Sequence, residues 1–131
     1  MIHITQKTLE DLEFDTVCSH LSERCTTEKG KAKALAIKPY PSPKEVLFGL
    51  HQTNEYLSSR TAETPIPNHG FDTIDQEIKY LDIEDYTLEK GSFKKLASIS
   101  ETVNIQLKFF KKFEEQFPTL QETVSQTPYT K

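Results

Sequence analysis

The feature that most constrains the fold is a stretch between Phe93 and Phe117 in which apolar residues recur every three or four positions. This spacing places side chains on one side of an α-helix, whereas a half-buried strand would need strict alternation. We expect one long helix over about residues 90–116, closed by Pro118. A surface helix needs one apolar stripe, but this pattern has two, so the second needs a partner. The first stripe is Phe93, Leu96, Ile99, Val103, Leu107 and Phe110, and the second is Ile105, Phe109, Phe113 and Phe117.

A further helix is predicted where Ser42, Pro43 and Glu45 combine a capping hydroxyl, a proline at the first helical position and a carboxylate that reaches back. It should extend to about residue 60. A polar loop over residues 61–70 follows, then a short helix capped by Asp72, and a last helical piece spans about residues 119–125. The inward stripe expected for the helix that begins at Pro43 is Val46, Leu47, Leu50, Asn54 and Leu57.

Two shorter helical patterns occupy residues 7–39. Thr8, followed by Asp11, and Thr27, followed by Glu28, have the character of helix starts, because a threonine oxygen can accept hydrogen bonds from unpaired backbone N–H groups. Pro39 should end the second helix. The apolar residues of this segment lie at helical steps and are Leu9, Leu12, Val17, Leu21 and Cys25.

These patterns predict an all-α fold, an antiparallel helical bundle with one long C-terminal helix. We expect residues 1–131 to form a single helical domain. The hydrophobic fraction, 35%, is low for a self-sufficient globule of this length, which favours a fragment of a longer protein.

Charge and cysteine content narrow the classes of function. The formal net charge is −4, and no segment is a polycation, so nonspecific phosphate binding has no strong driving force. No apolar run approaches the roughly 20 residues of a membrane helix and no leader is recognisable, so we expect a cytoplasmic protein with no membrane partner. Cys18 and Cys25 should be reduced thiols, with a metal or redox pair as the alternative.

No catalytic, cofactor-binding or metal-ligating set is expected in this chain, and it should not be an enzyme. Gly30-Lys31 is not a phosphate-binding loop, because Cys25 stands where such a loop needs its first glycine and Ala32 follows the lysine. The four histidines are scattered over different elements. Two lysine clusters lie near phenylalanines and are compatible with a solvated face or with nucleic acid; they are Lys90, Lys94 and Lys95, and Lys108, Lys111 and Lys112.

Several residues of the N-terminal segment form a recognisable pattern. Leu12 to Asp15 read Leu-Glu-Phe-Asp, a small amphipathic helix follows, and then Gly30-Lys31 opens a helix that leads to Pro39. This order resembles the start of the core domain in MutS-like DNA mismatch repair ATPases, of the bacterial branch that lacks the mismatch-reading module. Ile37 stands where that pattern more often has leucine.

The resemblance implies a helical core, or lever, segment that links a DNA clamp to an ATPase. Under this hypothesis ATP and Mg²⁺ bind elsewhere in the parent protein, DNA is reached through the parent, and the partners of this chain are the remaining core, the clamp, the ATPase and a possible second copy. The alternative is a free-standing helical adaptor that binds partner helices. In either case the predicted interaction surface is Phe109, Phe113 and Phe117.

Overall fold

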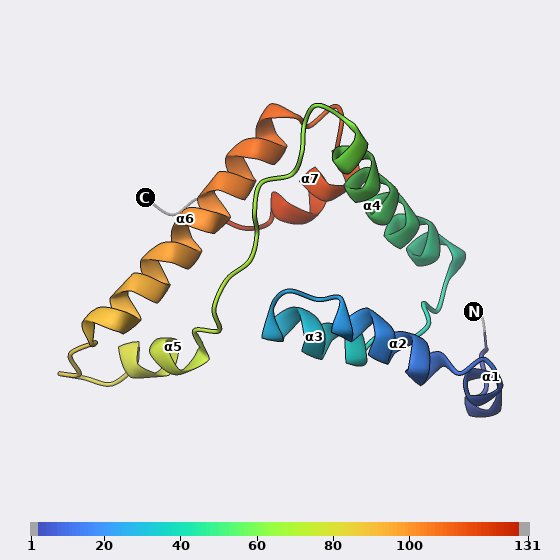
Figure 1. Cartoon of the computed structure of the whole chain (residues 1–131), viewed down its shortest axis with the longest axis horizontal. Coiled ribbons are helices and arrows are strands. Elements are labelled where there is room, and N and C mark those ends of the chain that lie inside the picture. Colours follow the sequence, from blue (N-terminus) through green and yellow to red (C-terminus); the bar gives the residue numbers. More distant parts are fainter. Residues whose placement is uncertain (1–2, 129–131) are drawn as a thin grey trace. The chain divides into compact units, whose positions relative to one another are not determined.

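The structure is a computed structural model that describes residues 3–128, and within this range it is entirely helical, with seven helices and no strand (Figure 1). The predicted all-α class is therefore confirmed. The helices are α1 (Gln6–Asp11), α2 (Phe14–Glu23), α3 (Glu28–Leu35), α4 (Pro43–Thr61), α5 (Asp75–Leu81), α6 (Lys90–Lys112) and α7 (Pro118–Val124).

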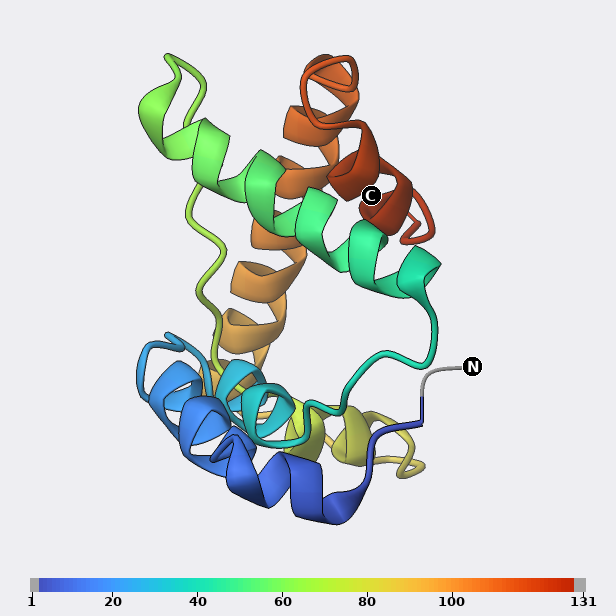
Figure 2. The ribbon, with the colours of Figure 1, turned by 90° about the vertical axis from the view of Figure 1, so that its right-hand side faces the viewer.

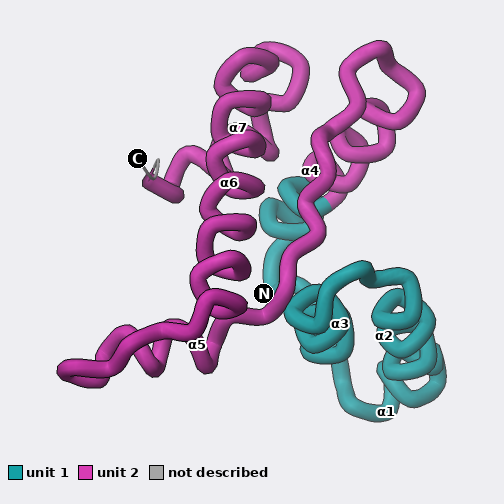
Figure 3. Tube along the Cα trace, turned by 60° about the vertical axis from the view of Figure 1, so that its left-hand side comes forward, with its two compact units in different colours: residues 1–49 teal, residues 50–131 magenta. Residues whose placement is uncertain are grey.

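The chain divides into two compact units (Figure 3). Unit 1 comprises residues 1–49 and contains α1, α2, α3 and the first part of α4. Unit 2 comprises residues 50–131 and contains the rest of α4 with α5, α6 and α7.

Unit 1 is organised by caps and by one break in the helical backbone. Thr5 caps α1 by accepting a hydrogen bond from the backbone N–H of Thr8, so this helix begins before Thr8 rather than at it. Glu13 adopts a left-handed conformation with φ of 50°, which ends α1 and redirects the chain into α2. Helix α2 packs against α1 and α3, and the unit buries Cys18 and Ala34.

Three other helix boundaries were predicted with different success. The start of α4 is confirmed, because Ser42 Oγ accepts from the Glu45 N–H and donates to the Glu45 carboxylate. Helix α3 ends at Leu35, four residues before Pro39, so the proline is not what stops it. The expected cap at Asp72 is wrong, because α5 begins at Asp75 and its N-cap is Ile74.

The long helix is present but shorter than predicted. Helix α6 starts at Lys90 as expected, ends at Lys112, and has Phe113 as its C-cap residue. The backbone then turns through residues 113–116 before Pro118 opens α7. The turn comes one helical turn before the proline, so the second phenylalanine stripe does not continue along one straight helix.

A carboxylate from α4 holds the start of α7. Glu55, only 9% exposed, accepts from the backbone N–H of Thr119 at 2.9 Å and of Leu120 at 2.8 Å, one with each carboxylate oxygen. Pro118 has no N–H, and the Gln121 N–H bonds to Phe117 within the chain. The first N–H groups of α7 are therefore satisfied, although its own N-cap residue provides no side-chain bond.

Further polar contacts tie unit 2 together around this cap. Figure 2 shows α7 beside α4 and α6, and the Gln52 amide donates to Thr123 Oγ1 at 2.7 Å. The loop between α4 and α5 is held to α6, because the Gln106 amide donates to the carbonyls of Pro67 and Asn68. At the other edge of the unit, Lys95 of α6 pairs with the Glu77 carboxylate of α5 at 3.1 Å.

Helix α4 packs with its polar side inward, which contradicts the inward stripe predicted from its sequence. The residues it buries are Glu55 and Ser59. Ser59 Oγ donates to the Tyr56 carbonyl, which satisfies the buried hydroxyl. Val46 of the expected stripe is half-buried, but its other members lie at the surface, with Leu47 at 55% and both Leu50 and Leu57 at 57% exposure. The pattern located an amphipathic helix correctly and assigned its faces in reverse.

Replacing Glu55 by glutamine tests the importance of the cap. The amide keeps one acceptor oxygen but presents an NH₂ group to the second backbone donor, so we expect a loss of about 1–3 kcal/mol in the free energy of unfolding. Urea titration monitored by circular dichroism measures this free energy. The exposed Glu122 of α7, changed to glutamine, is the control and should shift stability by less than about 0.5 kcal/mol. Equal stability of both variants would show that the cap contributes nothing.

Candidate functional site

The three phenylalanines predicted as an interaction surface come together where α6 meets α7. The Phe109 ring centroid lies 4.9 Å from that of Phe113 and 5.7 Å from that of Phe117. Phe110, from the other predicted stripe, joins the cluster at 5.3 Å from Phe109 and 6.0 Å from Phe117. These tilted and edge-to-face arrangements are those that aromatic pairs favour.

The members of this cluster differ in exposure. Phe117 is fully buried and Phe110 is 5% exposed, whereas Phe109 and Phe113 are half-buried. The Lys112 ammonium lies 5.1 Å from the centroid of the Phe113 ring, a cation–π distance. Phe117 therefore belongs to the core of unit 2, and only Phe109 and Phe113 offer part of their rings to the outside.

Beside the cluster, unit 2 has an open apolar hollow of about 300 Å³. Its walls come from α4, the following loop, α6 and α7, which the Glu55 cap and the Gln106 bonds hold in place. His69 meets the Tyr56 ring edge-on at 5.8 Å between centroids, and its Nδ1 lies 3.1 Å from the Pro67 carbonyl. The lining residues are Tyr56, Ile66, His69, Gln106, Phe110, Leu120 and Val124.

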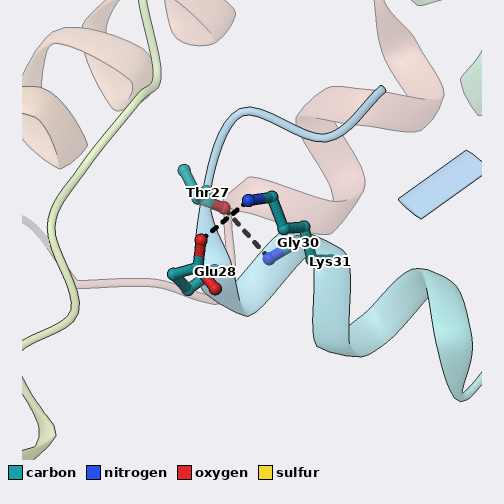
Figure 4. Close-up of polar contacts among 4 residues, drawn as sticks. All are labelled: Thr27, Glu28, Gly30 and Lys31. Atoms are coloured by element: carbon teal, nitrogen blue, oxygen red, sulfur yellow. Dashed lines mark hydrogen bonds and ion pairs between the residues drawn. The ribbon is translucent and has the colours of Figure 1, made fainter. Parts of the chain in front are cut away.

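The Gly30-Lys31 pair is part of a helix start (Figure 4). The backbone N–H of Gly30 donates to Thr27 Oγ1 at 3.0 Å, which confirms the predicted Thr27 cap. A Cβ added at position 30 would lie 3.0 Å from the same oxygen, so the tight cap favours glycine there. The Lys31 ammonium donates to the Glu28 carboxylate at 2.8 Å, and this bond raises the pKa of Lys31 above its ordinary value.

The other polar groups singled out by the sequence are dispersed. Cys18 is buried and Cys25 half-buried, and both are free thiols. Among residues 3–128, no group of three or more His, Cys, Asp or Glu side chains is placed to hold a metal ion. The pKa of Glu77 is held below its ordinary value, because the carboxylate accepts from its own backbone N–H and from Lys95.

The outward leucines of α4 are the feature that sequence reasoning missed. Their spacing was recognised, but the residue that determines which side of the helix faces inward is Glu55, whose partners lie more than sixty residues along the chain.

Within the described residues, no helix combines the length and apolar character needed to cross a membrane. Comparison of the chain with protein-family models, curated proteins and solved structures finds no match.

Truncating Phe117 to alanine should be among the most damaging changes in the chain. It removes a fully buried ring, and such truncations typically cost about 3–5 kcal/mol of unfolding free energy. Phe93, 58% exposed on α6, is the matched control, and its alanine variant should lose less than about 1 kcal/mol. Thermal unfolding of the two variants and of the unsubstituted chain makes the comparison. Similar losses of unfolding free energy in the two variants would show that the cluster is not the core of unit 2.

Proposed function

We propose that this chain is the N-terminal helical core, or lever, segment of a MutS-like DNA-binding ATPase, in which it scaffolds the link between a DNA clamp and the ATPase. Residues outside this chain bind the parent's ATP and Mg²⁺, and other parts of the parent make most of the DNA contacts. This chain supplies rigid helices that hold the clamp relative to the ATPase, so that nucleotide state changes how DNA is gripped.

The observation that supports this proposal most is the backbone role of the residues that carry the family pattern. The Leu-Glu-Phe-Asp run, residues 12–15, coincides with the break between α1 and α2, where Glu13 is left-handed. Gly30 fits closely under the Thr27 cap at the start of α3. Residues with such roles specify how helices are joined, as expected of a motif that defines an architecture.

The helices themselves suit a mechanical role. Helix α6 has 23 residues and so spans about 35 Å at 1.5 Å per residue. The Glu55 cap and the phenylalanine cluster fix α7 to one end of α6 and to α4. A displacement applied to one of these helices is transmitted to the others through packed contacts, because such contacts resist compression.

The alternative function, a free-standing helical adaptor, is favoured by one observation. The leucine side of α4 lies at the surface, as in a protein that docks a partner helix. The two functions are distinguished by the reading frame beyond Lys131, which for a MutS-like parent continues into a Gly-x-x-x-x-Gly-Lys-Ser/Thr motif. A stop codon soon after Lys131 would support the adaptor.

A second test uses the parent protein. If the chain is a lever, Glu55→Gln should reduce the stimulation of ATP hydrolysis by DNA and leave the basal rate unchanged, because the altered cap lies outside the nucleotide pocket. Glu122→Gln, an exposed change on α7, should alter neither rate. Undiminished stimulation of ATP hydrolysis by DNA in the Glu55 variant would contradict the lever function.

The isolated chain should not bind ATP, because it lacks a phosphate-binding loop, and its Gly-Lys pair starts a capped helix. Titration of the purified chain with ATP and Mg²⁺ in a calorimeter checks this, and a stoichiometric isotherm would contradict it.

DNA binding by the isolated chain should be weak and sensitive to salt. The net charge is −4, the positive charges are concentrated in two small lysine clusters, and Lys95 of the first cluster already pairs with Glu77. We expect dissociation constants no tighter than about 10⁻⁶ M at physiological salt, the range of nonspecific binding. Fluorescence anisotropy with duplex and branched DNA measures them, and submicromolar affinity would identify a dedicated DNA surface.

A further inference from the structure

The apolar hollow of unit 2, beside the phenylalanine cluster, has the size of a small-molecule site. Its volume of about 300 Å³ is at the lower end of the range for ligand pockets. A cavity of about 150 Å³ is enough to hold benzene, so this hollow has room for a bicyclic ring. Its walls come from four segments of unit 2, namely α4, the loop that follows it, α6 and α7.

Hydrogen bonds between these segments fix the shape of the hollow in advance. The carboxylate cap from α4 holds the start of α7. The Gln116 amide donates to Thr64 Oγ1 in the loop at 2.7 Å. Further along the loop, the Gln106 amide donates to the carbonyls of Pro67 and Asn68 at 2.9 and 3.2 Å. A pocket with fixed walls costs a ligand little ordering free energy.

Two of the three polar side chains in the wall are left as hydrogen-bond acceptors. The carbonyl oxygens of Pro67 and Asn68 can only accept, so Gln106 turns its NH₂ group to them and its amide oxygen remains. His69 Nδ1 lies 3.1 Å from the Pro67 carbonyl, so in the neutral imidazole Nδ1 carries the hydrogen and Nε2 accepts. The third side chain, Tyr56, has a hydroxyl that can donate or accept.

These features define the chemistry of a ligand. In the described part of the chain, no Asp, Glu, Lys or Arg side chain lines the hollow, so a charged group placed there would lose water without gaining an ion pair. The aromatic rings of Tyr56, His69 and Phe110 offer faces and edges that favour another aromatic ring. Because the remaining polar atoms are mainly acceptors, the ligand should carry a hydrogen-bond donor.

We propose that the hollow is a binding site for a neutral aromatic molecule with one N–H or O–H donor, of the indole or phenol class. The ring fills the apolar hollow, and the donor bonds to His69 Nε2 or to the Gln106 amide oxygen. The site lies within unit 2 alone and does not depend on the lever function.

Indole is the probe, and the full chain is suited to it because it contains no tryptophan. Indole emission, excited beyond the tyrosine absorption band, therefore reports the ligand alone. We expect saturable binding with a dissociation constant of about 10⁻⁴–10⁻³ M, as for a ligand of so few atoms. Indene, the same bicyclic framework without the N–H donor, should displace indole with about fivefold weaker affinity, because the hydrogen bond is not made.

The place of binding is tested by a variant that fills the hollow. Val124→Phe should abolish indole binding, because the added ring occupies the space of the ligand. Val17→Phe, on α2 and 59% exposed, is the matched control and should leave the affinity unchanged. Circular dichroism establishes that both variants remain helical.

An NMR titration of the unsubstituted chain gives the place of binding without any substitution. Indole should shift the imidazole signals of His69 and leave those of the other three histidines in place. The proposal is overturned if indole shows no saturable binding at millimolar concentration or if indole and indene bind equally well. Binding that leaves the His69 signals in place, or that persists in a folded Val124→Phe variant, would also overturn it.

Discussion

The hydrogen bonds that the Glu55 carboxylate accepts from the first backbone N–H groups of α7 determine the arrangement of much of unit 2. A seven-residue helix is too short to be stable in isolation, and α7 opens with a proline and has no side-chain cap of its own. Glu55 supplies both missing acceptors from α4. Because the acceptor is a carboxylate at a helix N-terminus, the charge and the helix dipole also attract. Phe117, immediately before α7, is then held in the core against Phe109 and Phe110.

The same interaction fixes the rotation of α4 about its axis. A buried carboxylate must face its donors, since an unpaired charge in the interior would cost far more than leaving a leucine half in water. With Glu55 turned toward α7, Leu50 and Leu57 lie on the opposite side. The exposure of these leucines is thus a consequence of polar satisfaction within unit 2. Helix α4 therefore has a polar side that organises unit 2 and an apolar side that does not pack against unit 2.

Sequence reasoning succeeded where the signal is local. The caps at Thr27 and Ser42 depend on side chains three residues from their partners, so the starts of α3 and α4 could be read directly. It failed where the cause is distant. No local sequence signal near Phe113 indicates that α6 ends there. The turn is stabilised instead by the burial of Phe117 and by Glu55 of α4, which caps α7. For the candidate site, the three phenylalanines were correctly grouped, but their spacing could not show that the last of them is fully buried.

The Gly30-Lys31 pair illustrates why a short motif needs its structural context. In a phosphate-binding loop, the glycines leave backbone N–H groups free for a ligand. Here the Gly30 N–H is bound to Thr27, and the Lys31 ammonium to Glu28. Both groups that would contact a phosphate are engaged within a single helical turn. Glycine suits this position because a Cβ there would lie 3.0 Å from the Thr27 hydroxyl oxygen. The residue pair that is typical of nucleotide binding in one setting is part of a helix start in this one.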